Sequence, residues 1–197
     1  MNLILHRPFK PWHMTREWGV IPIDPKTGES YYKPYGFLRH NGWDVVALEV
    51  GNPPKKKSHW PVFCPGEGLR VFATLNSPGG GKELDLISIN ELDLPTGRGY
   101  LGLVFMHNDH IFVKPGDVLA LGEAMCVSDN TGTATTGEHV HMGVYRVNKY
   151  WQKLDKNDSA GSFNPALLFK ETYALDLASV PTILLSYARY YKYLVGL

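Results

Sequence analysis

The chain has 197 residues, of which 44% are hydrophobic, and this is enough for one well-packed domain with additions. Its formal net charge is +1 and only 20% of its residues are charged, which argues against a nucleic-acid partner. Twenty glycines, fourteen prolines and a 12% aromatic share are typical of a turn-rich β protein.

The amino-terminal half begins without a recognisable secretory signal. Its apolar run of three or four residues is too short for one, and Pro8 and Pro11 follow at once. Residues 15–48 alternate short apolar pieces with Pro, Gly and Asp, which predicts loops and a hairpin leading into a strand at Asp44 to Leu48. A polar loop with a lysine cluster is expected over residues 49–59.

Short apolar segments then recur at regular spacing, with turn signals between them. The segments are WPVFCPGEGLRVFATL, LDLISINEL, RGYLGLVFMH, EAMCVS and HVHMGVYRV. No long helical period precedes Pro165, so the pattern predicts a mainly β fold, either an antiparallel sheet or a sandwich. Cys64 and Cys126 lie within apolar segments, which favours buried free thiols over a disulfide.

Only the carboxyl-terminal segment is predicted to be helical, with a break at Pro181. Its apolar and aromatic residues recur at steps of three and four, as on one face of a helix: Leu184, Tyr187, Tyr191 and Leu194. We expect this face to pack on the sheet domain or on a partner, because exposing it to water is costly. The segment is too short, and carries too many basic residues, for a transmembrane span.

Two histidines stand one residue apart in the last predicted strand, TGEHVHMGVY. Side chains at positions i and i+2 of a strand share a face, so His139 and His141 point the same way, while Val140 and Met142 point towards a core. Taken alone, this pattern suits a solvated hairpin as well as it suits a metal site.

A second cluster of donor residues occurs earlier in the chain, in RHNGWD. Gly42 allows a tight turn that brings the His40 imidazole and the Asp44 carboxylate together. Taken alone, the His40–Asp44 pattern is better explained as a polar turn than as a metal site. With one histidine of the later pair it supplies three nitrogen and oxygen ligands and leaves a fourth position for water, which is the pattern of a catalytic zinc site.

Four segments resemble, in the same order, the motifs of the lysostaphin-type zinc endopeptidases, which cut peptide bonds in bacterial peptidoglycan. They are HNGWD, WPVFCPGEGLRV, FMHNDHIFVKPGDVLALGEAM and TGTATTGEHVHMGVY. The resemblance implies an antiparallel β fold, the duplicated hybrid motif, in a peptidase domain over residues 1–165 with its core at about 15–147. A helical extension over residues 166–197 would follow.

The resemblance also implies the roles of five residues. The zinc ligands would be His40, Asp44 and His141, and the catalytic pair would be His107 and His139. A zinc ion in such a site lowers the pKa of its bound water towards ~7 and polarises a carbonyl oxygen. One catalytic histidine would then accept or orient the proton of the water, and the other would hydrogen-bond the oxyanion or the leaving nitrogen.

The other histidines match the motifs less well. His107 rather than His110 has the family's spacing of six residues before the valine of the Val-Lys-x-Gly-Asp segment, here Val113. His110 is expected at the surface or behind the site, and the histidines outside the motifs are expected to be solvated: His6, His13 and His59. Glu138 stands where the family commonly has proline, so the loop beside the cleft is expected to differ, and residues 49–59 could form a wall of the groove.

The sequence therefore predicts a zinc endopeptidase that acts at the cell wall, on stem peptides or cross-bridges of peptidoglycan. It could be a phage lysin or virion-associated hydrolase, or the mature fragment of an extracellular or periplasmic bacterial enzyme. The alternative is a non-catalytic relative that serves as a binding or regulatory module, but such proteins typically lose metal ligands. A two-histidine phosphoryl carrier would have no need of Asp44. Metal analysis separates these hypotheses.

Overall fold

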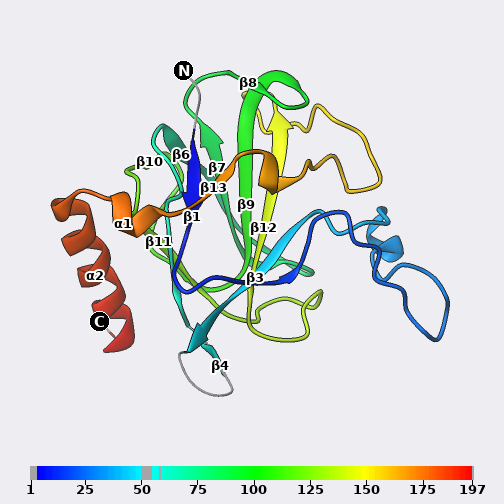
Figure 1. Cartoon of the computed structure of the whole chain (residues 1–197), viewed down its shortest axis with the longest axis horizontal. Coiled ribbons are helices and arrows are strands. Elements are labelled where there is room, and N and C mark those ends of the chain that lie inside the picture. The colour runs from blue at the N-terminus through cyan, green and yellow to red at the C-terminus, as the bar shows by residue number, and fades with distance from the viewer. Residues whose placement is uncertain (1–3, 50–54, 58, 197) are drawn as a thin grey trace.

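The computed structural model of the chain describes residues 4–49, 55–57 and 59–196. Its centre is an eleven-stranded, antiparallel β-sheet, which confirms the predicted mainly β fold (Figure 1). In spatial order, its main path is β10 (Val118–Leu119), β6 (Leu69–Ser77), β7 (Gly81–Ser88), β9 (Gly97–Ile111), β12 (Val140–Val147), β3 (Gly42–Glu49) and β2 (His13–Arg16). The strands off this path are β4 (Lys55–Lys57), β5 (Pro61–Phe63), β8 (Leu92–Leu94) and β11 (Ala124–Ser128).

A small parallel sheet joins the two ends of the chain, through β1 (Leu5–Arg7) and β13 (Phe169–Tyr173). The prediction of a wholly helical tail is wrong at β13, because Phe169 is only 9% exposed and packs on Trp43 with ring centroids 5.7 Å apart. The lysine cluster was also expected in a loop, yet its backbone pairs with β3 as strand β4. Residues 50–54 and Ser58 of the same insert lie outside the described residues.

The two faces of the central sheet have different roles. On β12, Val140, Met142 and Val144 are fully buried in the main core, together with the Cys64 and Cys126 side chains, which are free thiols as expected. Burying a side chain of this size stabilises the fold by about 1.5–3 kcal/mol. The alternate positions of β12 point to the other face, which is therefore available for polar side chains.

The helical elements are short, apart from the last one. They are η1 (Lys33–Tyr35), η2 (Pro165–Leu167), α1 (Ala174–Leu177) and α2 (Val180–Leu194). The tail breaks just before Pro181, as predicted, because α1 ends at Leu177 and α2 begins at Val180. Pro181 lies in the first turn of α2, where a proline costs no hydrogen bond, and Ser179 caps the helix by accepting a bond from the Thr182 N–H. Within the described part of the chain, no helix has the length and apolarity needed to cross a membrane.

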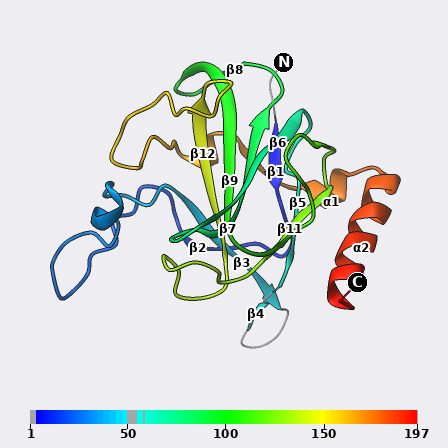
Figure 2. The same cartoon turned by 180° about the vertical axis from the view of Figure 1, so that it is seen from behind.

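Helix α2 lies beside β11 at one side of the sheet, and the segment around η1 projects at the opposite side (Figures 1 and 2). The sequence predicted the wrong face for its contact with the sheet. Ser186 is fully buried, accepting a bond from the Ala124 N–H at 2.8 Å and donating one to the Gly122 carbonyl at 3.0 Å. The predicted face is more than half exposed at all four positions: Leu184, Tyr187, Tyr191 and Leu194.

Replacing Ser186 with alanine should destabilise the protein, whereas the same change at Leu184 should not. Ser186→Ala leaves a buried N–H and a carbonyl without their partner, which costs about 1–3 kcal/mol. In a domain of this size each kcal/mol lowers Tm by roughly 2–4 °C. Thermal unfolding of the two variants measures the difference, and a larger loss for Leu184→Ala would mean that α2 docks through its other face.

Candidate metal centre

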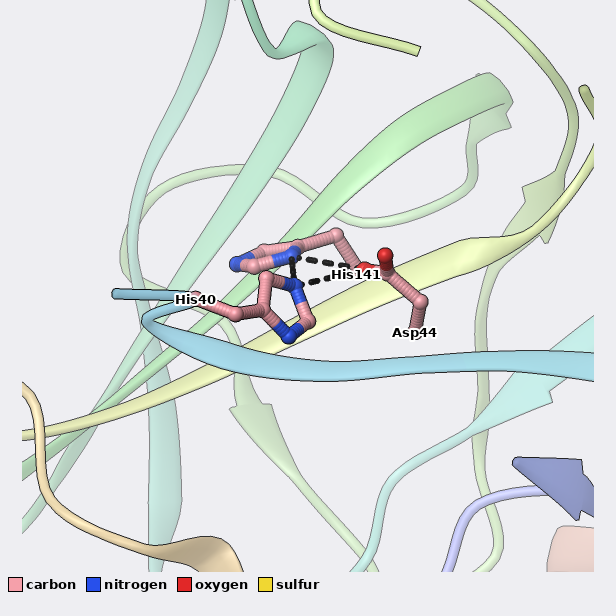
Figure 3. A group of neighbouring side chains, drawn as sticks. All are labelled: His40, Asp44 and His141. Carbon is pink, nitrogen blue, oxygen red and sulfur yellow. Dashed lines mark hydrogen bonds and ion pairs between the residues drawn. The ribbon is translucent and has the colours of Figure 1, made fainter. Parts of the chain in front are cut away.

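Three donor side chains meet on the face of the sheet that points away from the main core (Figure 3). Asp44 lies on β3 directly opposite His141 on β12, and His40 lies just before β3. The Asp44 Oδ1 atom is 3.0 Å from the Nε2 atom of His40 and 2.9 Å from the Nδ1 atom of His141. The two nitrogens are 3.1 Å apart. The predicted convergence of His40 and Asp44 is confirmed, but the predicted tight turn is not, because Gly42 begins strand β3.

This meeting point depends on a close approach of β3 to β12. A Cβ atom added at Gly42 would lie 2.4 Å from the Met142 carbonyl oxygen and 2.9 Å from the Cε1 atom of His141. The absence of a side chain at Gly42 is thus a steric requirement of the strand pairing and of the His141 position.

The backbone sets the proton position on His40. Its Nδ1 atom is 2.9 Å from the Glu17 carbonyl oxygen, and a carbonyl can only accept, so Nδ1 carries the hydrogen. The Nε2 lone pair of a neutral His40 then faces Asp44 and His141. Tyr32 stacks on the His40 ring with the centroids 5.8 Å apart and holds its plane.

The charge states leave electron-rich atoms facing one another. Burial raises the pKa of the Asp44 carboxyl, but the surrounding imidazoles of His139, His141 and His40 outweigh it, and the pKa lies well below its usual value. Burial lowers the pKa of His141, which is therefore neutral at pH 7. One carboxylate oxygen and two imidazole nitrogens packed this closely repel each other unless a cation or proton lies among them.

The donor set fits a zinc ion. In a tetrahedral zinc site, bonds of about 2.0–2.1 Å place the donor atoms roughly 3.4 Å apart. The three atoms here are within a few tenths of an ångström of that spacing, and all three residues are buried. Imidazole and carboxylate ligands are also the types that zinc accepts, and three of them leave one position open for water or substrate.

His139 and His107 lie beside these three residues. The Nδ1 atom of His139 donates to the Gly137 carbonyl at 2.7 Å, and its Nε2 atom is 3.5 Å from Asp44 Oδ1. The Nδ1 atom of His107 donates to the Thr131 carbonyl at 2.8 Å. The His107 ring centroid is 4.7 Å from that of His139 and 6.3 Å from that of His141. In their neutral forms, both histidines therefore present an Nε2 lone pair.

A β-bulge brings His107 to this face. Strict alternation along β9 would put His107 on the same side as Phe105, which is fully buried in the main core. Two β9 residues instead stand opposite one residue of β7, between the Lys82–Asn108 and Leu84–Phe105 pairs, and His107 has a φ of 66°. Burial lowers the pKa of His107 to about 4, so this imidazole is neutral at pH 7.

The structure thus brings together all five residues that the sequence singled out. His110 lies apart from them, exposed, with its ring 5.6 Å from that of Tyr193 on α2. His13 is exposed and His59 is partly exposed, as expected for solvated side chains.

Sequence reasoning missed other groups at the site. Three are backbone carbonyls, of Glu17, Thr131 and Gly137, and no sequence pattern could have revealed them. Two are side chains, Arg16 and Tyr32, which no motif had marked.

Comparison with known proteins identifies relatives of the chain by sequence and by fold. No model of a known protein family matches the chain. Over 138 residues it is 28% identical to the peptidoglycan DD-endopeptidase ShyA of Vibrio cholerae, which covers 70% of this chain. The chain spans only 27% of the length of that curated relative.

Among solved structures, a zinc-containing peptidase from Vibrio cholerae matches with a TM-score of 0.54 and 21% identity, over 73% of this chain and 36% of the other. The catalytic domain of lysostaphin from Staphylococcus simulans matches with a TM-score of 0.52 and 19% identity, over 79% and 90% of the two chains. The chain therefore has the lysostaphin-like peptidase fold, and its resemblance to these peptidases is confirmed.

Adding a methyl group at Gly42 should separate β3 from β12 and disturb the three donor atoms. We expect Gly42→Ala to cost about 1–3 kcal/mol through overpacking and to weaken the binding of divalent metal. Gly79→Ala is the matched control, because a Cβ atom there makes only ordinary van der Waals contacts at 3.6 Å, with Ala134 and Tyr35, and its φ is not positive. Calorimetric unfolding and a zinc titration measure both effects, and equal behaviour of the two variants would contradict the steric argument.

Proposed function

We propose that this chain is a zinc-dependent endopeptidase that hydrolyses peptide bonds of bacterial peptidoglycan. One observation carries the proposal, namely the convergence of His40 Nε2, Asp44 Oδ1 and His141 Nδ1 within 3.1 Å of one another. These would be the metal ligands, and His107 and His139 would be the catalytic pair. The lysostaphin-like fold and the sequence likeness to a peptidoglycan endopeptidase support this reaction class.

A bound zinc ion would supply a water of lowered pKa and an electrophile for the scissile carbonyl. Asp44 would be the one anionic ligand, and the neighbouring imidazoles lower its pKa, so it is ionised at neutral pH. His40 is oriented by the Glu17 carbonyl, which fixes the tautomer that presents Nε2 to a metal.

The two remaining histidines would handle protons. Each has its Nδ1 hydrogen bound to a backbone carbonyl, so each can accept a proton only at Nε2. His139 Nε2 faces the ligand group and would take the proton of the attacking water, because it is the nearer of the two to Asp44. Once protonated, either imidazole becomes a donor, to the oxyanion or to the leaving nitrogen.

The substrate and the place of action are part of the same proposal. The name of the curated relative supports peptidoglycan as the substrate. The enzyme would then act at the cell wall, in an extracellular or periplasmic setting, and delivery by a phage particle remains a hypothesis of the same kind. We propose the same division of the chain, into a peptidase domain over residues 1–165 and an extension over residues 166–197.

Digestion of purified peptidoglycan tests the function directly. Sacculi with direct cross-links and sacculi with peptide bridges are incubated with the zinc-loaded protein, and the fragments are identified by mass. We expect new pairs of amino and carboxyl termini that disappear when a chelator removes the metal and return when zinc is added. If both kinds of sacculus stay intact with a fully loaded protein, the chain is not a peptidoglycan endopeptidase.

Alanine variants separate ligands from proton-handling residues. His141→Ala should lose both zinc and activity, because it removes one of three protein ligands. His139→Ala and His107→Ala should keep zinc and fold but lose activity by about 10²-fold or more. His110→Ala is the control and should be close to wild type. Zinc content by mass spectrometry, read beside the cleavage rate, checks the assignment, and it is inverted if His139→Ala loses the metal while His141→Ala keeps it.

A further inference from the structure

An arginine lies against the candidate metal centre and has no role in the scheme above. Arg16 is the last residue of β2 and stands opposite Asp44 in the register of β2 and β3. Its Nη1 atom donates to the Tyr32 hydroxyl at 3.0 Å and approaches the Asp44 Oδ2 atom at 3.5 Å. The side chain is 42% exposed, so its remaining surface is open to solvent beside the site.

Most of the donors of this guanidinium are unused. Both contacts of the Arg16 guanidinium involve Nη1, and within the part of the chain that the structure describes, Nε and Nη2 have no hydrogen-bond partner. Three other arginines on the surface bind a carboxylate of their own at 2.6 Å, while Arg7 and Arg98 pair with carboxylates at 3.2–3.3 Å. The three closer pairs are Arg39 with Asp158, Arg146 with Asp155 and Arg189 with Glu123. Arg16 has only a long contact, to the Oδ2 atom of Asp44, whose Oδ1 atom is one of the three candidate metal-binding atoms.

The charges around Arg16 favour an anion. A divalent metal held by one carboxylate and two neutral imidazoles keeps a net positive charge, to which the guanidinium adds another. Tyr32 accepts a hydrogen bond from Arg16 and so fixes its direction. An oriented guanidinium with a free edge binds a carboxylate through two parallel N–H bonds more readily than any other common group.

We propose that Arg16 determines specificity by binding a free carboxylate on the substrate residue whose nitrogen leaves when the peptide bond is cut. The inference rests on the proposed function and narrows its substrate class. In such a residue the carboxyl carbon is three bonds from the scissile carbonyl carbon, and therefore within about 4 Å of it. Arg16 is next to a ligand carboxylate, so a carboxylate at that distance from the reacting carbonyl is within its reach.

The substrate class follows from this contact. In some cross-links, the residue that contributes the nitrogen of the scissile bond keeps a free α-carboxylate. Such a cross-link presents the negative charge that Arg16 can bind. In the interior of a peptide bridge, the same carboxyl is consumed by the next peptide bond and carries no charge. The enzyme should therefore prefer cross-links at a residue with a free α-carboxylate to bonds within a bridge.

Matched peptides test the inference in the zinc-loaded protein. Acetyl-D-alanyl-D-alanine and its carboxamide differ only in the charge next to the scissile peptide bond. The same holds for the acid and amide forms of a cross-linked peptide that still contains the bond cut in sacculi. The wild type should prefer the acid form by roughly 10- to 100-fold in kcat/KM, the scale of charge-assisted hydrogen bonds. Arg16→Ala should bring this ratio close to one, mainly through KM, and Arg16→Lys should restore part of it.

Arg98→Ala is the control, because Arg98 is an exposed β9 residue paired with Glu91 and Asp93 rather than with the site. Zinc content is measured for every variant. A loss of metal from Arg16→Ala, with both peptides affected equally, would show that Arg16 only positions Asp44. Equal cleavage of acid and amide by the wild type would also overturn the inference.

A binding measurement keeps this result separate from the fate of the proposed function. In the zinc-loaded His139→Ala variant, which should keep the metal and cut slowly, the Nε–H signal of Arg16 is followed by NMR as acetyl-D-alanyl-D-alanine or its amide is added. A shift with the acid alone supports the carboxylate site even if the wild type cuts no peptide, in which case it is the endopeptidase proposal that fails. Identical spectra with the two peptides contradict the carboxylate site.

Discussion

The pairing register of β3 against β12 is the constraint on which the candidate site depends. It sets Asp44 opposite His141, and a slip by one residue would turn His141 into the core and its neighbours out of it. The register is held by the opposite face of β12, where Val140 and Met142 are fully buried. The core therefore fixes the ligand geometry, although no ligand belongs to it. Gly42 makes the pairing sterically feasible, and its own partner in the register is Gly143.

Main-chain carbonyls then decide what the imidazoles can do. Glu17, Thr131 and Gly137 each accept the Nδ1 hydrogen of a different histidine, so the reactive nitrogen is Nε2 in all three. These carbonyls belong to segments outside the strands that carry the ligands. The loops around the site thus contribute to its chemistry through their backbone path, and their side chains are free to vary as long as that path is kept.

Much of this could be predicted from the sequence because it depends on local periodicity. Alternation along the strand put His139 and His141 on one face, and the short spacing of His40 and Asp44 put both donors near one point, although Gly42 lies in β3 and not in the expected turn. The position of His107 could not be derived in this way, because alternation assigns it to the core side and only the bulge in β9 reverses that. The motif resemblance found the residue without explaining its position. In helix α2 the periodicity predicted the helix but not the face that contacts the sheet. A buried serine, rather than the apolar stripe, makes that contact.

The way α2 is attached has a consequence for local stability. Ser186 is the only residue that is buried among those described in the helix, and two polar bonds hold its carboxyl-terminal half, from Arg189 to Glu123 and from Tyr193 to Asp109, both at 2.6 Å. Detaching it would expose little apolar surface, so the change in heat capacity would be small and denaturant would promote it only weakly. Its amide hydrogens would then exchange with solvent through a subglobal opening, separate from the cooperative unfolding of the sheet.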